Sequence, residues 1–193
     1  HAGLSPSPQV VREAIAFQTK RANSDPSFHI WRRQDNELDP IRKRMAALIG
    51  CQEDELALTM NATYGLQTGI LGVPMSAGDE IVTTSHDYPR AFSAMAQRKR
   101  REGTTFVKVP ITSPPETATK IASDILAAVS PKTKLVLLSQ MTFVSGQIMP
   151  TRAVADGLKD KGIPFFVDGA HGIGLLPEKF PEMGADIYAA CLH

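Results

Sequence analysis

From Leu56 onward, the sequence alternates between short apolar runs and segments with helical spacing, and few folds accommodate that alternation. The expected strands cover residues 56–60, 80–84, 105–110, 134–139, 163–167 and 186–190. The expected helices cover residues 62–72, 88–102, 121–129 and 151–161. Strands that alternate with helices predict a mostly parallel sheet that is covered on both faces. The predicted fold class is therefore α/β.

The first part of the chain lacks this alternation. Ser7-Pro8 predicts the start of a helix, because a capping residue is followed by proline. Residues 23–35 are expected to be irregular, and Asp39-Pro40 predicts a second helix start, with Gly50 ending that helix. We therefore expect an N-terminal segment at residues 1–35 and one main domain at residues 36–193.

Composition excludes several classes of function. The net charge of +1 gives no reason to expect nucleic acid or an anionic membrane as a partner, and no apolar run is long enough to span a bilayer. The two cysteines form no disulfide framework, so a reducing, cytoplasmic location is expected. No HxxxH or CxxC spacing predicts a metal site. The basic run Arg98–Arg101 is interpreted as structural, because cations favour the last turn of a helix.

One apolar run ends in charged and polar residues. Residues 163–167 predict a strand buried on both faces, and Asp168, Gly169, Ala170 and His171 follow it directly. Open α/β folds place ligands where such strands end. Asp168 is therefore either part of an ordinary Asp-Gly turn or a functional carboxylate beside His171.

Three other expected strand ends also carry polar residues. Asn61-Ala62-Thr63 begins a helix, where free backbone N–H groups favour phosphate, although Asn61 could simply cap the helix. His86 and Tyr88 offer flat rings for stacking, or lie in a plain surface loop. Hydroxyl residues follow the strand at 134–139. No P-loop, GxGxxG or GxSxG motif is present, which argues against the usual nucleotide sites and a serine hydrolase.

Together these segments resemble the class V aminotransferase family of pyridoxal-phosphate enzymes, which includes cysteine desulfurases and isopenicillin N epimerases. The matching segments are Asn61-Ala62-Thr63, Ser85-His86-Asp87-Tyr88, Asp168-Gly169-Ala170-His171 and Cys191-Leu192-His193, with His1-Ala2-Gly3-Leu4 at the start. The resemblance implies a three-layer α/β/α large domain like that of aspartate aminotransferase, with a mostly parallel, mixed sheet. It also implies pyridoxal 5'-phosphate as cofactor, a Schiff-base lysine directly after His193, an absent C-terminal small domain and a homodimer.

The resemblance assigns roles to individual residues. Asp168 would face the pyridine nitrogen and His171 the phenolic oxygen, and these two are the expected catalytic residues. His86 would stack on the ring, with Tyr88 as the alternative. The cofactor-binding residues that it implies are Ala62, Thr63, His86, Tyr88, Thr142, Asp168, His171, Cys191 and His193.

Two positions depart from the family pattern. Cys191 stands where many members have a serine, and Phe143 stands where desulfurases have an asparagine. Both make a standard desulfurase less favoured, whereas residues 23–33 and 83–90 are closer to the epimerase-like branch. The expected function is a pyridoxal-phosphate enzyme acting on amino acids or related amines, of aminotransferase or isopenicillin N epimerase type. The alternatives are a cysteine desulfurase or C–S lyase, and a non-catalytic α/β ligand-binding module.

Overall fold

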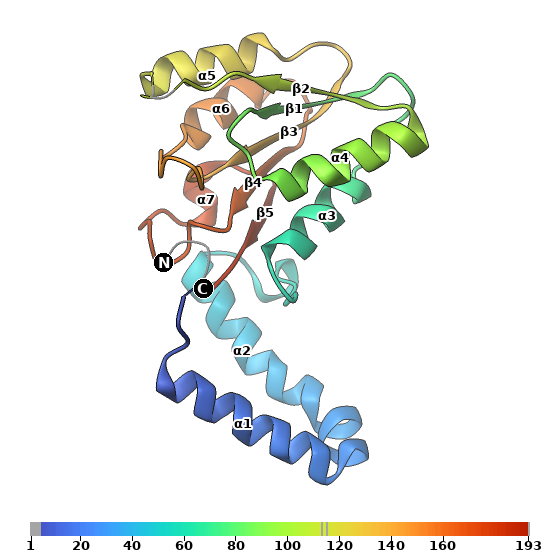
Figure 1. Ribbon diagram of the computed structural model, residues 1–193, viewed down its shortest axis with the longest axis vertical. Coiled ribbons are helices and arrows are strands. Elements are labelled where there is room, and N and C mark those ends of the chain that lie inside the picture. Colours follow the sequence, from blue (N-terminus) through green and yellow to red (C-terminus); the bar gives the residue numbers. More distant parts are fainter. Residues whose placement is uncertain (1–4, 113, 115, 193) are drawn as a thin grey trace. The chain divides into compact units, whose positions relative to one another are not determined.

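The computed structural model describes residues 5–112, 114 and 116–192 (Figure 1). The chain divides into two compact units, one up to Leu58 and one spanning Thr59–Leu192. The second unit is built on a five-stranded sheet in the order β2-β1-β3-β4-β5, in which every pair of neighbours is parallel. The strands are β1 (Glu80–Thr84), β2 (Thr105–Val109), β3 (Thr133–Ser139), β4 (Phe165–Gly169) and β5 (Ile187–Ala190).

Helices cover both faces of this sheet (Figure 1). One face packs against α3 (Ala62–Gly72) and α4 (Pro89–Glu102). The other face packs against α5 (Ala118–Ala127), α6 (Thr151–Leu158) and α7 (Phe180–Met183). The predicted α/β class with three layers is confirmed, and the described strands make the sheet wholly parallel.

Strand β4 is buried along its whole length, as the apolar run predicted. Phe165 and Val167 belong to the cluster under α5, α6 and α7, whereas Phe166 belongs to the cluster under α3 and α4. Each fully buried side chain of this size contributes about 1.5–3 kcal/mol to folding. Because side chains alternate along a strand, Asp168 follows Phe166 onto the α3 and α4 face.

Two glycines bring α3 close to the sheet. A Cβ atom on Gly69 would lie 2.3 Å from Cε1 of Phe166, and one on Gly65 would lie 2.9 Å from Cβ of Ala189. Any side chain at Gly69 would therefore push the helix away from β4. The close packing places the first turn of α3 beside the end of β5.

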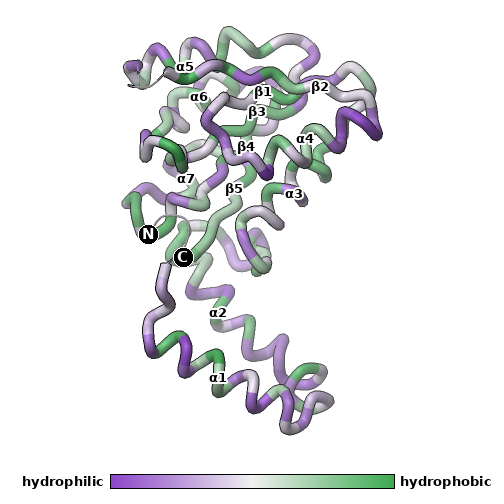
Figure 2. Tube along the Cα trace, in the orientation of Figure 1, coloured by the Kyte–Doolittle hydropathy of each residue, from purple (hydrophilic) through white to green (hydrophobic). Residues whose placement is uncertain are grey.

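Arg98 is the buried member of the basic run at the end of α4, which Figure 2 shows as a hydrophilic stretch. Its Nη1 donates hydrogen bonds to the carbonyl oxygens of Ile70 at 2.6 Å and Val73 at 2.7 Å, and its Nε pairs with Glu102 at 2.7 Å. Arg98 therefore has a structural role, as predicted, but it binds carbonyl groups at the end of α3 and not at the end of its own helix. The carbonyls that it satisfies belong to the last turn of α3 and the residue that follows it.

The first unit is helical almost throughout. It contains α1 (Gln9–Ser24), the π-helix η1 (Ser27–Arg33), α2 (Gln34–Ile49) and the short 3-10 helix η2 (Glu53–Glu55). The prediction that residues 23–35 are irregular is wrong, because η1 continues directly into α2. The predicted helix start at Asp39-Pro40 is also wrong, since Pro40 lies inside α2. Gly50 ends α2 as predicted, with a left-handed φ of 89°.

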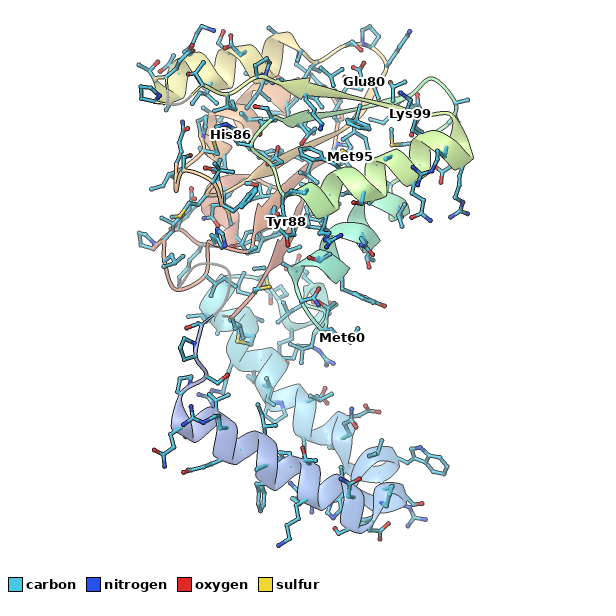
Figure 3. The ribbon with its side chains drawn as sticks, in the orientation of Figure 1. Met60, Glu80, His86, Tyr88, Met95 and Lys99 are labelled. Atoms are coloured by element: carbon cyan, nitrogen blue, oxygen red, sulfur yellow. The ribbon has the colours of Figure 1, made fainter. Side chains whose placement is uncertain are left out.

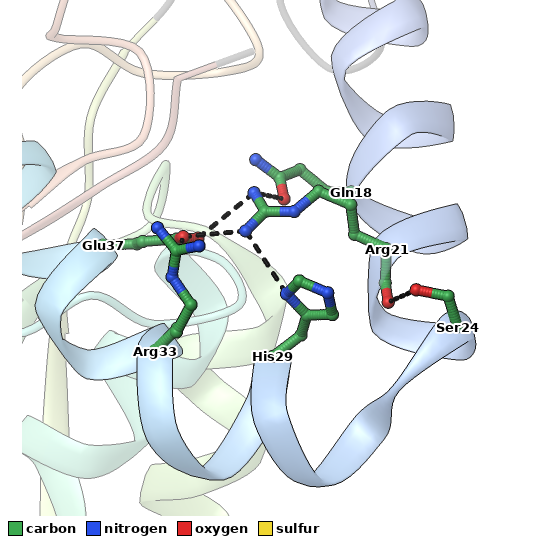
Figure 4. A network of polar contacts seen from close by, with 6 residues as sticks. All are labelled: Gln18, Arg21, Ser24, His29, Arg33 and Glu37. Carbon is green, nitrogen blue, oxygen red and sulfur yellow. Dashed lines mark hydrogen bonds and ion pairs between the residues drawn. The ribbon is translucent and has the colours of Figure 1, made fainter.

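A polar network holds this unit together around Arg21 (Figure 4). The Arg21 guanidinium donates to Glu37 Oε1 at 2.9 Å and to Gln18 Oε1 at 3.0 Å, and lies 3.3 Å from Nδ1 of His29. Arg33 adds a second ion pair to Glu37 at 3.3 Å. The hydrogen bond from Arg21 lowers the pKa of the Glu37 carboxyl. Through these contacts α1, η1 and α2 are tied to one another.

The expected strand at residues 56–60 is absent, and these residues are irregular. A strand needs a partner for its backbone groups, and none of the five described strands pairs with this segment. Within the part of the chain that is described, no helix is long and apolar enough to cross a bilayer.

Candidate functional site

The strand order creates a switch point between β1 and β3. The chain leaves β1 for β2 on one side and then returns to β3 on the other side of β1. In open α/β sheets, ligands bind outside the carboxyl ends of the strands at such a point. Figure 3 shows Glu80 and His86 at opposite ends of β1, with His86 and Tyr88 on the segment that follows its carboxyl end. The residues expected at the site follow the same edge of the sheet.

Asp168 occupies the end of β4, in register with Ser139 on β3 and Ala189 on β5. It is 4% exposed, and its Oδ1 accepts the N–H of Ala170 at 3.0 Å. Burial, with the negative charge of Asp87 acting in the same direction, raises the pKa of the Asp168 carboxyl to about 7 against the opposing Ala170 hydrogen bond. None of the described lysine or arginine side chains forms an ion pair with Asp168. Its ionised form would therefore be stabilised by a cationic ligand group.

His171 lies in the turn that follows β4 and is partly buried. The turn is closed by a hydrogen bond from the N–H of Gly172 to the carbonyl of Gly169 at 2.8 Å. Asp168 and His171 are therefore carried by one short segment at the carboxyl edge of the sheet, as the sequence predicted.

A partly buried chain of hydrogen bonds lies beside this turn. The hydroxyl of Tyr188 on β5 donates to Oε1 of Gln140 at 2.9 Å, and Nε2 of Gln140 donates to Glu178 at 3.0 Å. Burial and the charges of Asp168 and Glu178 raise the pKa of the Tyr188 hydroxyl. A Cβ atom on Gly169 would lie 2.1 Å from the Tyr188 ring, so glycine is required beneath it.

Gln140 and Tyr188 were not identified from the sequence. The only signal in the sequence was a glycine, Gly169, just after one expected strand and an aromatic residue, Tyr188, in the next. Such a pair indicates close packing of the two strands but does not predict the hydrogen bond to Gln140. The contact joins residues 48 positions apart, and spacing alone does not predict it.

The start of α3 lies beside Cys191. The Asn61 side chain caps the helix by accepting the N–H of Tyr64 at 2.9 Å, which leaves the N–H of Ala62 for another partner. The N–H of Ala62 donates instead to Sγ of Cys191 at 3.1 Å. Sulfur is a weak acceptor, so a phosphate oxygen would be a better partner for this N–H group. Thr63 follows as the second residue of the helix and is partly buried.

The two candidate stacking rings differ in their surroundings. His86 is partly buried, and its Nδ1 is a buried atom without a hydrogen-bond partner among the described residues. Tyr88 is 38% exposed and meets Phe143 edge to face, with ring centroids 5.6 Å apart. Tyr88 and Phe143 thus form an aromatic pair between the segments that follow β1 and β3.

Asp87, which lies between His86 and Tyr88 in the sequence, is 1% exposed. Its carboxylate accepts hydrogen bonds from Thr83, Thr84 and Ser139. The sequence placed Asp87 inside a motif but gave it no role of its own. Its contact with Ser139 spans 52 positions, which explains why local pattern did not reveal it.

Two of the expected cofactor-binding residues, Thr142 and His193, stay predicted contacts. Thr142 is buried, and its hydroxyl contacts Ser145 Oγ at 2.8 Å and accepts the N–H of Gln147 at 3.2 Å, so it already shapes its own loop. His193 lies outside the described residues, as do residues 1–4.

The geometry fits pyridoxal phosphate. A buried carboxylate that forms no ion pair with any described lysine or arginine suits a protonated ring nitrogen, and the first N–H of α3 suits a phosphate. The rings of His86 and Tyr88 come from the same edge of the sheet. A parallel α/β unit with these features defines a cofactor-binding domain of the pyridoxal-phosphate enzyme class.

The chain belongs to the class V aminotransferase family, whose model, described as aminotransferase class-V, matches residues 1–193. It is 25% identical to isopenicillin N epimerase of Streptomyces clavuligerus over 188 residues, which cover 97% of this chain and 47% of that protein. It is also 25% identical to a probable cysteine desulfurase of Vibrio cholerae, with 100% of this chain and 48% of that protein covered.

A solved structure of the cystine C–S lyase C-DES, in complex with its reaction product cysteine persulfide, has the same fold. The TM-score is 0.87 at 25% identity, with 100% of this chain and 52% of that chain covered. The chain therefore spans about half the length of the relatives that it matches.

Proposed function

We propose that the protein is a pyridoxal-phosphate-dependent enzyme that acts on amino acids or related amines. The observation that carries the proposal is the buried Asp168 at the end of β4, because a carboxylate in that position suits a protonated ring nitrogen. When bound, the cofactor supplies an electron sink for a carbanion formed at the substrate α-carbon. Asp168 would hold the ring-nitrogen proton through a charge-assisted hydrogen bond.

The other residues of the edge would bind and orient the cofactor. Ala62 and Thr63 would donate their N–H groups to the phosphate, next to Cys191. His171 would bond the phenolic oxygen, and His86 would lie over the ring, with Tyr88 as the alternative. Thr142 and His193 remain predicted contacts, as does the lysine expected directly after His193.

Two positions of the sequence bear on the type of reaction. We favour aminotransferase or isopenicillin N epimerase chemistry, because Phe143 and Cys191 replace residues expected of a standard desulfurase. The second candidate is a C–S lyase or cysteine desulfurase, and the similarity to the cystine C–S lyase structure supports it. Assays of the full-length protein with a panel of amino acids, measuring keto acid, pyruvate, sulfide and stereochemical inversion, would separate the two.

We also propose a homodimer that takes a small-molecule amine as substrate. Apolar side chains exposed on α1, among them Val10, Ile15 and Phe17, are compatible with a subunit contact. The molar mass of the full-length protein from light scattering tests the proposal, and a monomeric mass at micromolar concentration would contradict it. A cytoplasmic location stays a prediction.

Cofactor binding is tested most directly by adding pyridoxal phosphate to the full-length protein and recording its visible absorption. We expect a protein-bound absorption band that survives desalting, and turnover with at least one amino acid. Asp168→Asn should retain part of the cofactor but lose most turnover, because a neutral amide does not hold the ring-nitrogen proton as a carboxylate does. A protein that stays colourless would instead support the non-catalytic ligand-binding alternative.

A further inference from the structure

We infer that Asp87 is a positioning residue, whose carboxylate joins the turn after β1 to the end of β3 and so fixes the rings of His86 and Tyr88 toward the bound cofactor. The inference rests on the proposed function, because it concerns how that cofactor is held. It assigns a role to a residue that lies in the sequence between the two candidate stacking residues, His86 and Tyr88, and is almost fully buried.

The hydrogen bonds of Asp87 divide between its two carboxylate oxygens. Oδ2 accepts from Thr83 Oγ1 at 2.7 Å, Thr84 N at 2.7 Å and Thr84 Oγ1 at 2.8 Å, all within its own segment. Oδ1 accepts from the backbone N–H and the hydroxyl of Ser139, both at 2.7 Å. Neutral donors thus stabilise a buried carboxylate.

The position of these bonds explains why they matter. Between β1 and β3 the paired residues run from Glu80 and Thr133 to Val82 and Val136, and the ladder goes no further. Beyond that point β1 continues its pairing with β2, and β3 continues with β4. The two strands therefore lose their backbone pairing toward their carboxyl ends, on the side of the switch point, and the Asp87 side chain joins them there.

The same bonds connect the turn to the carboxylate at the centre of the site. Ser139 pairs in register with Asp168, and the N–H of Gln140 donates to the carbonyl of Asp168 at 2.8 Å. A displacement of Asp87 would therefore change the position of the rings relative to Asp168. The negative charge of Asp87 also contributes to the raised pKa of the Asp168 carboxyl.

A simple turn cap would need less than this. Bonds to Thr84 alone, three residues earlier in the chain, would be enough to close the turn after β1. The two bonds to Ser139 reach another strand and add nothing to that turn. These two bonds fix the turn that carries His86 and Tyr88 relative to the strand end that is paired with Asp168.

The test compares Asp87→Asn, Ser139→Ala and the control Asp79→Asn in the full-length protein. Asparagine keeps the shape of Asp87 but turns one acceptor oxygen into a donor group facing a backbone N–H. Asp79 accepts the N–H of Ser76 at 2.6 Å, in the turn that precedes β1, at the opposite end of that strand. Each protein is titrated with pyridoxal phosphate, and the visible circular dichroism of the bound cofactor reports the orientation of its ring.

We expect Asp87→Asn to weaken cofactor binding at least tenfold and to change the circular dichroism band. Ser139→Ala should change the band with a smaller loss of affinity, and Asp79→Asn should bind and appear as the wild type does. If Asp87→Asn does not fold, the altered band of Ser139→Ala tests the inference. Wild-type affinity and dichroism in a folded Asp87→Asn, or in Ser139→Ala when Asp87→Asn is unfolded, would overturn it. A wild-type protein that does not bind the cofactor would overturn the proposed function itself and this inference with it.

Discussion

The backbone N–H of Ala62 donates to Sγ of Cys191 at 3.1 Å and joins the first turn of α3 to the residue that follows β5. The two residues are 129 positions apart in the sequence. The contact places a thiol where the helix offers an N–H group to an anion, so the sulfur is part of the surroundings of any phosphate bound there.

Cys191→Ser should tighten cofactor binding, because a hydroxyl is a stronger hydrogen-bond donor than a thiol. We expect the dissociation constant for pyridoxal phosphate to fall by roughly fivefold, as one improved hydrogen bond of about 1 kcal/mol would give. Equilibrium titration of the cofactor-free full-length protein measures it. Cys51→Ser removes the other thiol, in the first unit, and should leave the constant unchanged. Weaker binding by Cys191→Ser would contradict the prediction.

The buried carboxyl of Asp168 should make stability depend on pH. An unfolded chain releases this proton near the ordinary pKa of 3.8, whereas the folded chain keeps it to about 7. Between those values the folded state binds more protons, so the free energy of unfolding should fall as the pH rises, by roughly 1.4 kcal/mol per pH unit for this group. Melting temperatures of the cofactor-free protein across this window test it. The slope should flatten in Asp168→Asn and persist in Asp160→Asn, an exposed control.

Gly69→Ala and Gly72→Ala should have opposite effects on stability, although both lie in α3. At Gly69 a methyl group would meet Phe166 at 2.3 Å, and overpacking of this kind costs about 1–3 kcal/mol. At Gly72 nothing lies within 4 Å of the new atom, so alanine should stabilise the helix by about 0.5–1 kcal/mol. Denaturant unfolding measures both. Equal effects would mean that α3 does not pack closely on β4.

Arg98→Met should destabilise the protein by about 2–4 kcal/mol, because it leaves the carbonyls of Ile70 and Val73 without their charged donor. Arg101→Met changes an exposed residue of the same helix and should alter the free energy of unfolding by less than about 0.5 kcal/mol. Chemical denaturation of both variants gives the comparison. A small effect at both positions would show that Arg98 is not essential for ending α3.

Most of the sheet could be predicted because each strand is an apolar run bounded by turn residues. Residues 80–84 match β1, and the helix predicted at residues 62–72 matches α3. Burial decides these elements locally: a run of β-branched and aromatic residues needs cover on both faces wherever it lies. The sequence therefore carries enough information to place them one by one.

The errors arose where structure depends on distant neighbours. Residues 56–60 have the composition of a strand but no partner among the described strands, and composition does not report on partners. Pro40 suggested a helix start, yet the helical segment before it, η1 and the first residues of α2, is tied to α1 through Arg21 and Glu37. A proline inside a helix removes one backbone hydrogen bond, and the contacts of Arg21 and Arg33 with Glu37 lie in the helical segments that precede Pro40.

The candidate site shows the same division. Asp168 and His171 could be predicted because the end of β4 is a local feature of the sequence. Asp87 and the Tyr188–Gln140 hydrogen bond could not, because their partners lie on other strands. A motif predicts which residues reach an edge of the sheet, whereas their hydrogen bonds depend on the order in which the strands pair.

We expect the contact between Ala62 and Cys191 to form late during synthesis of the chain, because its two residues are 129 positions apart. The start of α3 leaves the ribosome early, but its neighbour at the end of β5 is among the last residues of this unit to appear. A nascent chain that has folded only β1 to β4 already contains Asp168 but still lacks Cys191, the residue beside the first N–H of α3. Contacts of such long sequence separation slow folding, because the entropy of closing the loop is lost before the contact stabilises the chain. An anion should therefore bind at this helix only after β5 has paired with β4, and a chain truncated before β5 would lack Cys191 beside the binding group.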